Sequence, residues 1–195
     1  ENDVIEKFCN TESISCFRGS EEDVLGRTYN SLRSMSADVG VEVYGDGPLI
    51  DPQIVDNIVR YYCTNQFYDF VGNDLKTTYP PGMEVEVFSV EALADSNRRV
   101  HKFDPIREHG TLFIRQNADL YSITNIEAPV EVRRPELELE VDTAEDLEVI
   151  RAIACYFDGR KDYTLLEMIQ FLDNNQEISA INNRIPRRWK EYRND

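Results

Sequence analysis

Asp46 lies between two glycines, directly after an apolar stretch, in the sequence ADVGVEVYGDGPLIDP. Glycine lets the backbone turn sharply and lets another group approach closely. An Asp at the carboxyl end of a central strand lies where open α/β sheets bind their ligands. The alternative is a polar turn in which Asp46 or Asp51 caps the helix predicted from Pro52. The stretch alone is compatible with both roles.

Asp142 is a second carboxylate in a comparable setting, in EVDTAEDL, where a predicted strand meets the start of a helix. If the two strands are parallel neighbours or near neighbours, Asp46 and Asp142 meet at one edge of the sheet. Mg²⁺ is commonly held by one or two carboxylates, with phosphate and water oxygens completing its shell. Such an ion neutralises charge that develops during attack on phosphorus. The alternative for Asp142 is a helix cap or dipole partner, and the spacing does not decide between them.

Hydrophobic periodicity indicates the elements that must position these carboxylates. The first part of the chain predicts helix, strand, helix, strand and helix, at residues 3–10, 14–17, 20–35, 37–44 and 52–63. Ser20 is the expected N-cap of the second helix, with Asp23 in a loose capping-box position. This alternation is typical of a parallel sheet wrapped by helices.

The remaining chain predicts four further strands and four further helices. The strands are expected at residues 67–71, 83–89, 120–129 and 133–141, and the helices at 90–100, 104–117, 143–157 and 164–175. Gly110 weakens the helix at 104–117, whereas Thr143 is a strong cap for the helix that follows Asp142. We expect one domain over residues 1–185 and an exposed tail over 186–195.

Composition limits the possible partners. The chain has 195 residues and a formal net charge of −16, which disfavours binding to a nucleic-acid backbone or an anionic membrane. It has no signal peptide and no apolar run near 18 residues, so we expect a soluble, cytoplasmic protein without membrane insertion. The four cysteines form no CxxC pair, which disfavours a zinc site and predicts buried thiols in a reducing compartment.

Five sequence blocks carry a resemblance to a known family. They are FRGSEEDVLGR, GDGPLIDPQIVD, TYPPGMEVEVFSVEAL, REHGTLFI and VDTAEDLEVIRAI, in this order along the chain. The order resembles the cytidylyltransferase-like family of spore coat polysaccharide biosynthesis protein F. That family is related to the synthetases for CMP-sialic acid and CMP-3-deoxy-manno-octulosonate. The resemblance extends from about residue 3 to residue 185.

The resemblance implies a Rossmann-like, GT-A-like nucleotidyltransferase fold, with a mixed, mainly parallel sheet flanked by helices. It implies that a sugar oxygen attacks the α-phosphorus of a nucleoside triphosphate, usually CTP, and that pyrophosphate leaves. It also implies a homodimer that pairs around residues 77–88, although an apolar hairpin there can equally be core. The sequence does not reveal which sugar is activated, and no general base can be named.

The resemblance assigns roles to individual residues. Asp46 and Asp142 correspond to the catalytic, Mg²⁺-binding aspartates. The implied nucleotide-binding residues are Arg18, Gly19, Ser20 and Gly45, and the implied substrate-binding residues are Tyr79, Glu84, Glu86, Arg107 and His109. The alternative for His109 is a buried, hydrogen-bonded histidine, and the alternative for Glu84 and Glu86 is a solvated strand face.

The chain departs from this family at its beginning. The family starts with a strand and a loop rich in Arg, Ser, Gly and Lys that holds the triphosphate, and the printed chain contains neither. The chain is then a piece of a longer protein, a short protein that needs a partner chain, or a nucleotide- or sugar-binding module without activity. A GT-A glycosyltransferase ranks last, because no Asp-x-Asp motif follows a strand. Gly47 stands where relatives often carry Cys, which exchanges one small residue for another.

Overall fold

A computed structural model describes residues 2–160 and 162–187. The chain forms two compact units, and each is built from two separate stretches. Unit 1 comprises residues 1–38 and 90–117, and unit 2 comprises residues 39–89 and 118–195. The predicted boundary at residue 185 stays a prediction, and most of the predicted tail lies outside the described residues.

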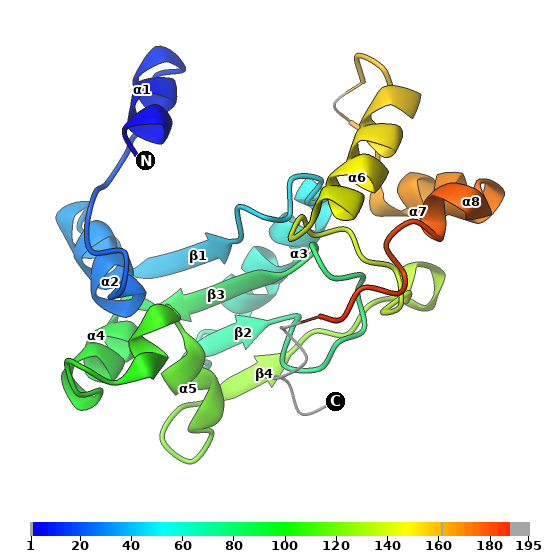
Figure 1. The fold of residues 1–195 in the computed structure, drawn as a ribbon. Helices are drawn as coiled ribbons and strands as arrows, with labels where there is room; N and C mark the ends of the chain where they lie inside the picture. Colours follow the sequence, from blue (N-terminus) through cyan, green and yellow to red (C-terminus); the bar gives the residue numbers. More distant parts are fainter. Residues whose placement is uncertain (1, 161, 188–195) are drawn as a thin grey trace. The chain divides into compact units, whose positions relative to one another are not determined.

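A four-stranded mixed sheet forms the centre of unit 2 (Figure 1). Its strands are β1 (Val39–Val43), β2 (Phe70–Gly72), β3 (Val85–Ser89) and β4 (Ile123–Asn125), in the spatial order β1-β3-β2-β4. Strand β3 is antiparallel to both neighbours, and β2 is parallel to β4. Three strands therefore point the same way and one is reversed. The expected mixed α/β sheet is confirmed, but only one of its three strand pairs is parallel.

The helices of unit 2 pack their apolar faces into one core with this sheet. They are α3 (Pro52–Thr64), α6 (Ala144–Tyr156), α7 (Leu165–Asn174), the short α8 (Gln176–Ser179) and the 3₁₀ turn η2 (Val130–Val132). The core joins Ile58 of α3, Val87 of β3, Ile153 of α6 and Met168 of α7, all almost inaccessible to solvent. Asp51 caps α3 and is followed by a proline in the first turn, where the missing N–H costs nothing.

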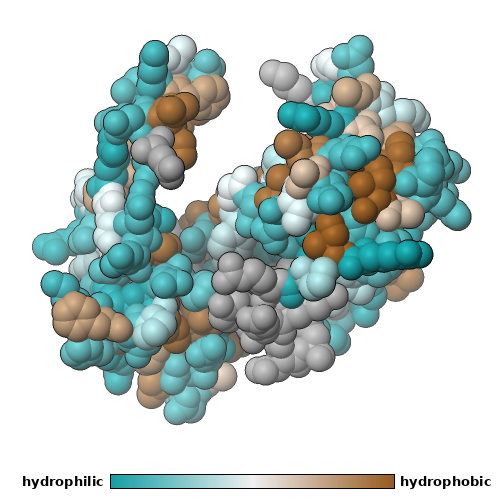
Figure 2. All heavy atoms as spheres, viewed as in Figure 1, coloured by the Kyte–Doolittle hydropathy of each residue, from teal (hydrophilic) through white to brown (hydrophobic). Residues whose placement is uncertain are grey.

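Unit 1 contains helices and a 3₁₀ turn. They are α1 (Asp3–Thr11), α2 (Val24–Ser34), α4 (Val90–Arg99), η1 (Pro105–Glu108) and α5 (Leu112–Gln116). Helix α2 packs against α4 and η1. Helix α1 has no buried residue, and its apolar side chains Val4, Ile5 and Phe8 are exposed, which gives the brown patch on this helix in Figure 2.

Several sequence predictions need correction. Residues 14–17 and 133–141 are not strands, because their described backbone groups pair with loops or helix ends instead of a neighbouring strand. The helix expected at 104–117 is divided into η1 and α5 around Gly110. Helix α2 is capped by Asp23, and Ser20 instead accepts a hydrogen bond from the Asp23 N–H. The cysteines are free but not buried: Cys16, Cys63 and Cys155 are exposed and Cys9 is half-buried.

Among the described residues, no helix is both long enough and apolar enough to cross a membrane.

Candidate functional site

Asp46 and Asp142 lie side by side in unit 2, although no pair of adjacent strands positions them. The backbone N–H of Val141 donates to the carbonyl of Asp46 at 2.8 Å, and that of Leu139 donates to the carbonyl of Pro81 at 2.8 Å. The extended segment 137–141 is thereby held against the loop that carries Asp46. The two aspartates come together as expected, while the ligand that they bind stays a prediction.

The Asp46 carboxyl group is in an unfavourable position for a negative charge. The residue as a whole is exposed, but partial desolvation of its carboxyl group, together with the nearby charge of Asp142, raises its pKa above the usual value. Two adjacent carboxylates resist simultaneous ionisation unless a positive charge compensates them. A positive charge placed between them would relieve this repulsion.

The two glycines beside Asp46 have different surroundings. A side chain at Gly47 would meet the carbonyl oxygen of Gly82 at 2.6 Å. Gly82 itself has a φ of +97°, and a Cβ there would lie 2.5 Å from the carbonyl of Leu139. A Cβ at Gly45 would meet nothing within 4 Å. The group that lies close to Gly47 is thus the backbone of Gly82, whereas the space beside Gly45 is open.

Neither aspartate caps a helix. Asp51 caps α3, because its Oδ1 accepts from the N–H of Gln53 at 2.8 Å, and its Oδ2 accepts from the N–H of Leu165 at 2.8 Å. Helix α6 begins with a capping box between Thr143 and Asp146. The alternative that named Asp46 or Asp51 as the cap of α3 is therefore confirmed for Asp51 and wrong for Asp46. The cap interpretation of Asp142 is wrong, and its role as a dipole partner stays a prediction.

Asp146 is a fully buried carboxylate directly behind Asp142. Its Oδ2 accepts hydrogen bonds from the backbone N–H groups of Asp142 (3.2 Å) and Thr143 (2.9 Å). Its side chain also accepts from Arg187 and Asn182. Burial opposes its ionisation, but these hydrogen bonds outweigh burial and hold the pKa of Asp146 well below its usual range. Sequence reasoning missed Asn182 and Arg187, because they lie far along the chain in an irregular segment.

Further acidic side chains surround the aspartate pair. Glu84, Glu138 and Glu140 are each at most 9% exposed. Glu140 Oε1 is buried without a hydrogen-bond partner, and burial, followed by the charges of Glu84 and Glu138, raises its pKa to about 8. Glu138 and Glu140 stand at alternate positions of the sequence ELELE (136–140), a pattern that could have drawn attention to Glu140.

The predicted sugar-side residues of unit 2 are buried or half-buried. Glu84 Oε2 accepts from the N–H of Gly82 at 2.7 Å, and Glu86 Oε1 accepts from the hydroxyl of Tyr44 at 2.7 Å. The solvated-face interpretation of both glutamates is therefore wrong. Tyr79 is half-buried, and burial, followed by the charge of Asp51, raises its pKa.

Within residues 2–160 and 162–187, no group of three or more His, Cys, Asp or Glu side chains is arranged to hold a metal ion. Asp46 and Asp142 can offer two carboxylates, which is the usual protein contribution when substrate phosphates and water complete the Mg²⁺ shell.

The predicted nucleotide-side residues 18–20 form an exposed loop in unit 1. Arg18 pairs with Asp3 and Glu6 of α1, each at 2.6 Å. A Cβ at Gly19 would meet the Arg27 side chain at 2.8 Å, so the stem of Arg27 covers this glycine. Contact of this loop with a nucleotide stays a prediction.

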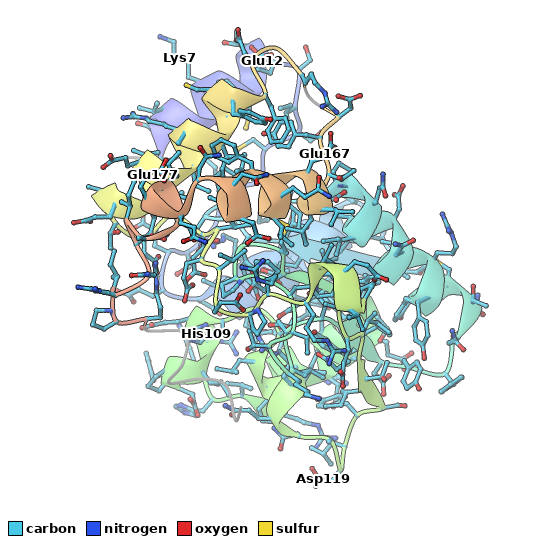
Figure 3. The ribbon with its side chains drawn as sticks, turned by 90° about the vertical axis from the view of Figure 1, so that its right-hand side faces the viewer. Lys7, Glu12, His109, Asp119, Glu167 and Glu177 are labelled. Carbon is cyan, nitrogen blue, oxygen red and sulfur yellow. The ribbon has the colours of Figure 1, made fainter. Side chains whose placement is uncertain are left out.

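Arg107 and His109 also belong to unit 1. Arg107 is buried and binds both carboxylate oxygens of Asp23, at 2.9 and 3.1 Å, and its Nη1 donates to the carbonyl of Val100. Its predicted role as a carboxylate binder is met here by the chain's own Asp23, and contact with a substrate stays a prediction. His109 follows η1 and is half-buried (Figure 3), and desolvation lowers its pKa.

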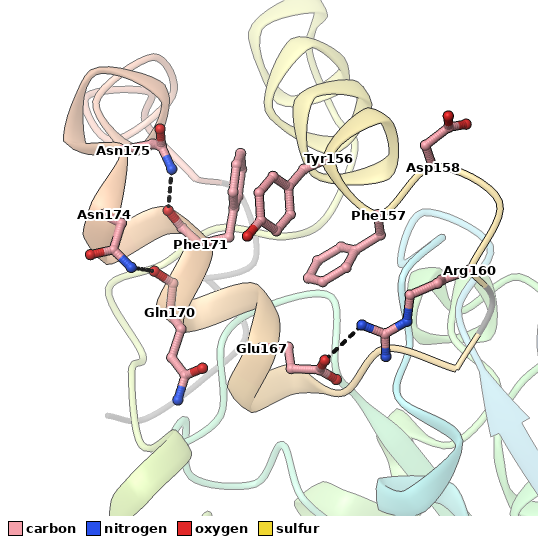
Figure 4. Close-up of a pocket in the computed structure, with 9 residues that line it drawn as sticks. All are labelled: Tyr156, Phe157, Asp158, Arg160, Glu167, Gln170, Phe171, Asn174 and Asn175. Carbon is pink, nitrogen blue, oxygen red and sulfur yellow. Dashed lines mark hydrogen bonds and ion pairs between the residues drawn. The ribbon is translucent and has the colours of Figure 1, made fainter.

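A cavity of about 470 Å³ lies at the other end of α6, between α6 and α7 (Figure 4). Helix α6 has 13 residues, so this cavity is about 20 Å along the helix from Asp142. Tyr156, Phe171 and Asn174 line it, and Arg160 and Glu167 form an ion pair at its edge. It is separate from the aspartate pair.

Comparisons with known proteins agree with this arrangement. A family model described as cytidylyltransferase matches residues 1–178. The uncharacterized protein MJ1063 of Methanocaldococcus jannaschii is 34% identical over 194 residues, which are 99% of this chain and 76% of that protein. The spore coat polysaccharide biosynthesis protein SpsF of Bacillus subtilis is 32% identical over 180 residues, which are 92% of this chain and 73% of SpsF.

A solved structure has the same fold. It is a cytidylyltransferase from Leptospira borgpetersenii serovar Hardjo-bovis, with a TM-score of 0.85 and 28% identity, and the match covers 95% of this chain and 76% of that one. The family match takes in most of the chain and both aspartate motifs. This chain therefore belongs to the cytidylyltransferase family.

Proposed function

We propose that this protein transfers CMP from CTP to a sugar that is used for cell-surface polysaccharide or glycan synthesis. In this reaction the oxygen of a sugar hydroxyl forms a bond to the α-phosphorus of CTP, and the hydroxyl proton is released to solvent. The bond between the α-phosphorus and the oxygen that bridges to the β-phosphorus breaks, and pyrophosphate leaves with the electron pair. Membership of the cytidylyltransferase family supports nucleotidyl transfer. The relative named for spore coat polysaccharide biosynthesis supports the sugar acceptor.

The observation that carries the proposal is the side-by-side placement of Asp46 and Asp142. We propose that they hold Mg²⁺, whose preferred ligands are carboxylate, phosphate and water oxygens. When bound, this ion would neutralise the charge that develops on the phosphate groups. The chain's own contribution is to fix the two carboxylates through the hydrogen bond from Val141 to Asp46, and to leave the Gly45 side open for a ligand.

Calorimetric titration with CTP, with and without Mg²⁺, tests this assignment. We expect Mg²⁺-dependent binding by the unaltered chain, and at least a tenfold weaker affinity in Asp46→Asn and Asp142→Asn with the fold retained. Glu148→Gln is the matched control, because it removes one exposed charge from α6 away from the pair. Unchanged binding in both aspartate variants would refute the metal assignment.

Incubation with CTP, Mg²⁺ and a panel of sugars then tests transfer, with pyrophosphate release as the readout. Binding of CTP without transfer to any sugar in the panel would favour the non-catalytic module over the enzyme.

A further inference from the structure

Arg187 and Asp146 form a buried, two-point ion pair in unit 2. Arg187 Nη1 donates to Asp146 Oδ2 at 2.9 Å, and Nη2 donates to Oδ1 at 2.6 Å. The two side chains are 1% and 0% exposed. A guanidinium and a carboxylate that meet through two parallel bonds fix each other's orientation as well as their distance.

The same Asp146 carboxylate fixes the backbone at Asp142. Its Oδ2, which Arg187 contacts, also accepts from the backbone N–H groups of Asp142 and Thr143 and from the Thr143 hydroxyl at 2.8 Å. The Asp142 side chain projects from this backbone. A shift of Asp146 therefore moves the backbone atoms from which the Asp142 side chain extends.

Asn182 makes a second connection from the same C-terminal segment. Its Nδ2 donates to Asp146 Oδ1 at 2.8 Å and to the carbonyl of Glu138 at 3.0 Å. Arg187 in turn donates to the carbonyl of Asn182 at 3.3 Å. Residues 182–187 thus bind both ends of the segment that runs from Glu138 through Asp142 to Asp146.

Helix capping alone does not account for these contacts, as α7 shows. Helix α7 has the same kind of capping box, between Thr164 and Glu167. There the carboxylate pairs with Arg160 at the surface, where the two side chains are 34% and 48% exposed (Figure 4). Burying a charged pair costs desolvation that a surface pair avoids. The capping box at the start of α6 differs from the one at α7 because Asp142 directly precedes it.

We propose that residues 182–187 act as a clamp, and that Arg187 and Asn182 are positioning residues that hold the Asp142 carboxylate in place through Asp146. This role rests on the proposed function of Asp142 in binding Mg²⁺. The clamp lies beyond residue 178, where the match to the family model ends. It therefore adds to the site a segment that the family model does not match.

The first test is hydrogen exchange of the backbone amides of residues 138–146, measured by mass spectrometry on the full chain. Asn182→Ala and Arg187→Lys should increase exchange at Asp142 and Thr143, because each weakens the hold on Asp146. Arg160→Met, which removes the corresponding arginine at the α7 box, should leave exchange in this segment unchanged. Equal exchange in the unaltered chain and in folded Asn182→Ala would overturn the clamp.

The second test is the Mg²⁺ concentration required for CTP binding, measured by calorimetry on variants whose circular dichroism shows a folded chain. Asn182→Ala and Arg187→Lys should require about tenfold more Mg²⁺, because groups that orient a metal ligand commonly change metal affinity by that amount or more. Arg160→Met should require the same Mg²⁺ concentration as the unaltered chain. A loss of stability without a change in the Mg²⁺ requirement would overturn the positioning role.

The two measurements also separate this proposal from the one on which it rests. If the unaltered chain binds no CTP with Mg²⁺, the proposed function fails, while the exchange experiment still decides whether residues 182–187 hold the Asp142 backbone. If Arg187→Lys does not fold, Asn182→Ala carries both tests, since it removes an amide and leaves the buried ion pair intact.

Discussion

At the scale of single residues, Gly47 and Gly45 flank the same aspartate for different physical reasons. Gly47 is in contact with the backbone of Gly82, which in turn is pressed against Leu139. These contacts stack three loops with no room for a side chain. A Cβ at Gly45 would contact no other part of the chain. The lack of a side chain at Gly45 therefore matters only for a bound ligand.

This contrast predicts opposite results for two matched substitutions. Gly47→Ala should lower the free energy of unfolding by about 1–3 kcal/mol, because a Cβ would force a backbone carbonyl to move. Gly45→Ala should change it by less than about 0.5 kcal/mol. Urea unfolding followed by circular dichroism measures both, and equal losses in the two variants would contradict this account of the loop.

At the scale of elements, the start of α2 depends on a contact with a distant segment of unit 1. Asp23 caps α2 through the N–H of Gly26 at 2.8 Å and also binds Arg107 from η1. Burial opposes the ionisation of Asp23. The hydrogen bonds from Arg107 and from the N–H of Gly26 outweigh burial and hold the pKa of Asp23 below its usual value. The geometry makes Arg107 a connection between α2 and η1.

We therefore predict that Arg107→Met destabilises unit 1. The free energy of unfolding should fall by about 1–3 kcal/mol, because the half-buried Asp23 loses a charged partner. Asp23→Asn keeps a cap but leaves the buried Arg107 guanidinium without its carboxylate partner, so it should cost at least as much. Thermal unfolding gives the comparison. A fully stable Arg107→Met chain with weakened CTP binding would contradict the structural role and support the predicted contact of Arg107 with substrate.

Element packing also bears on the predicted dimer. The segment expected to pair two copies contains most of β3, which has β1 on one side and β2 on the other. Residues 80–88 are buried in unit 2, and Ser89, which follows them, is partly buried. The alternative, a core hairpin, therefore describes this segment. A homodimer stays a prediction, and size-exclusion chromatography with light scattering would measure it.

At the scale of the whole molecule, acidic groups dominate, with a net charge of −16 and a largely hydrophilic surface in the view of Figure 2. Several of these groups converge on Glu140. Burial comes first among the causes of its raised pKa, and the charges of Glu84, Glu138, Asp142 and Asp46 add to it. Segments far apart in the sequence thus set the ionisation of one carboxyl group.

Glu140 should consequently contribute a loss of stability as the pH rises from about 5 to 8. Glu140 has a folded-state pKa of about 8 against an ordinary value of 4.5. Between these values the folded protein holds a proton that the unfolded chain releases, so the free energy of unfolding decreases by up to about 1.4 kcal/mol per pH unit. Glu140→Gln should flatten this dependence in urea unfolding measured across the range. An unchanged slope would show that Glu140 does not carry this proton.

The sequence determined much of this protein through local patterns. Periodicity predicted α3, α6 and α7, because their apolar faces repeat at helical spacing, and the Gly-Asp-Gly and Asp-Thr motifs identified Asp46 and Asp142. Five ordered blocks indicated the family. The helix and motif signals are short in range, and each can be read from a few to about a dozen consecutive residues. The family signal depends on the order of five such blocks along the chain.

The tertiary structure alone decided how those pieces support one another. Segment 137–141 has strand-like alternation, yet its described partners are loops at Pro81 and Asp46. Asn182 and Arg187 reach Asp146 across 36 and 41 residues. No local pattern encodes these contacts, because a buried charge selects its partner by proximity in the folded chain and not by spacing in the sequence.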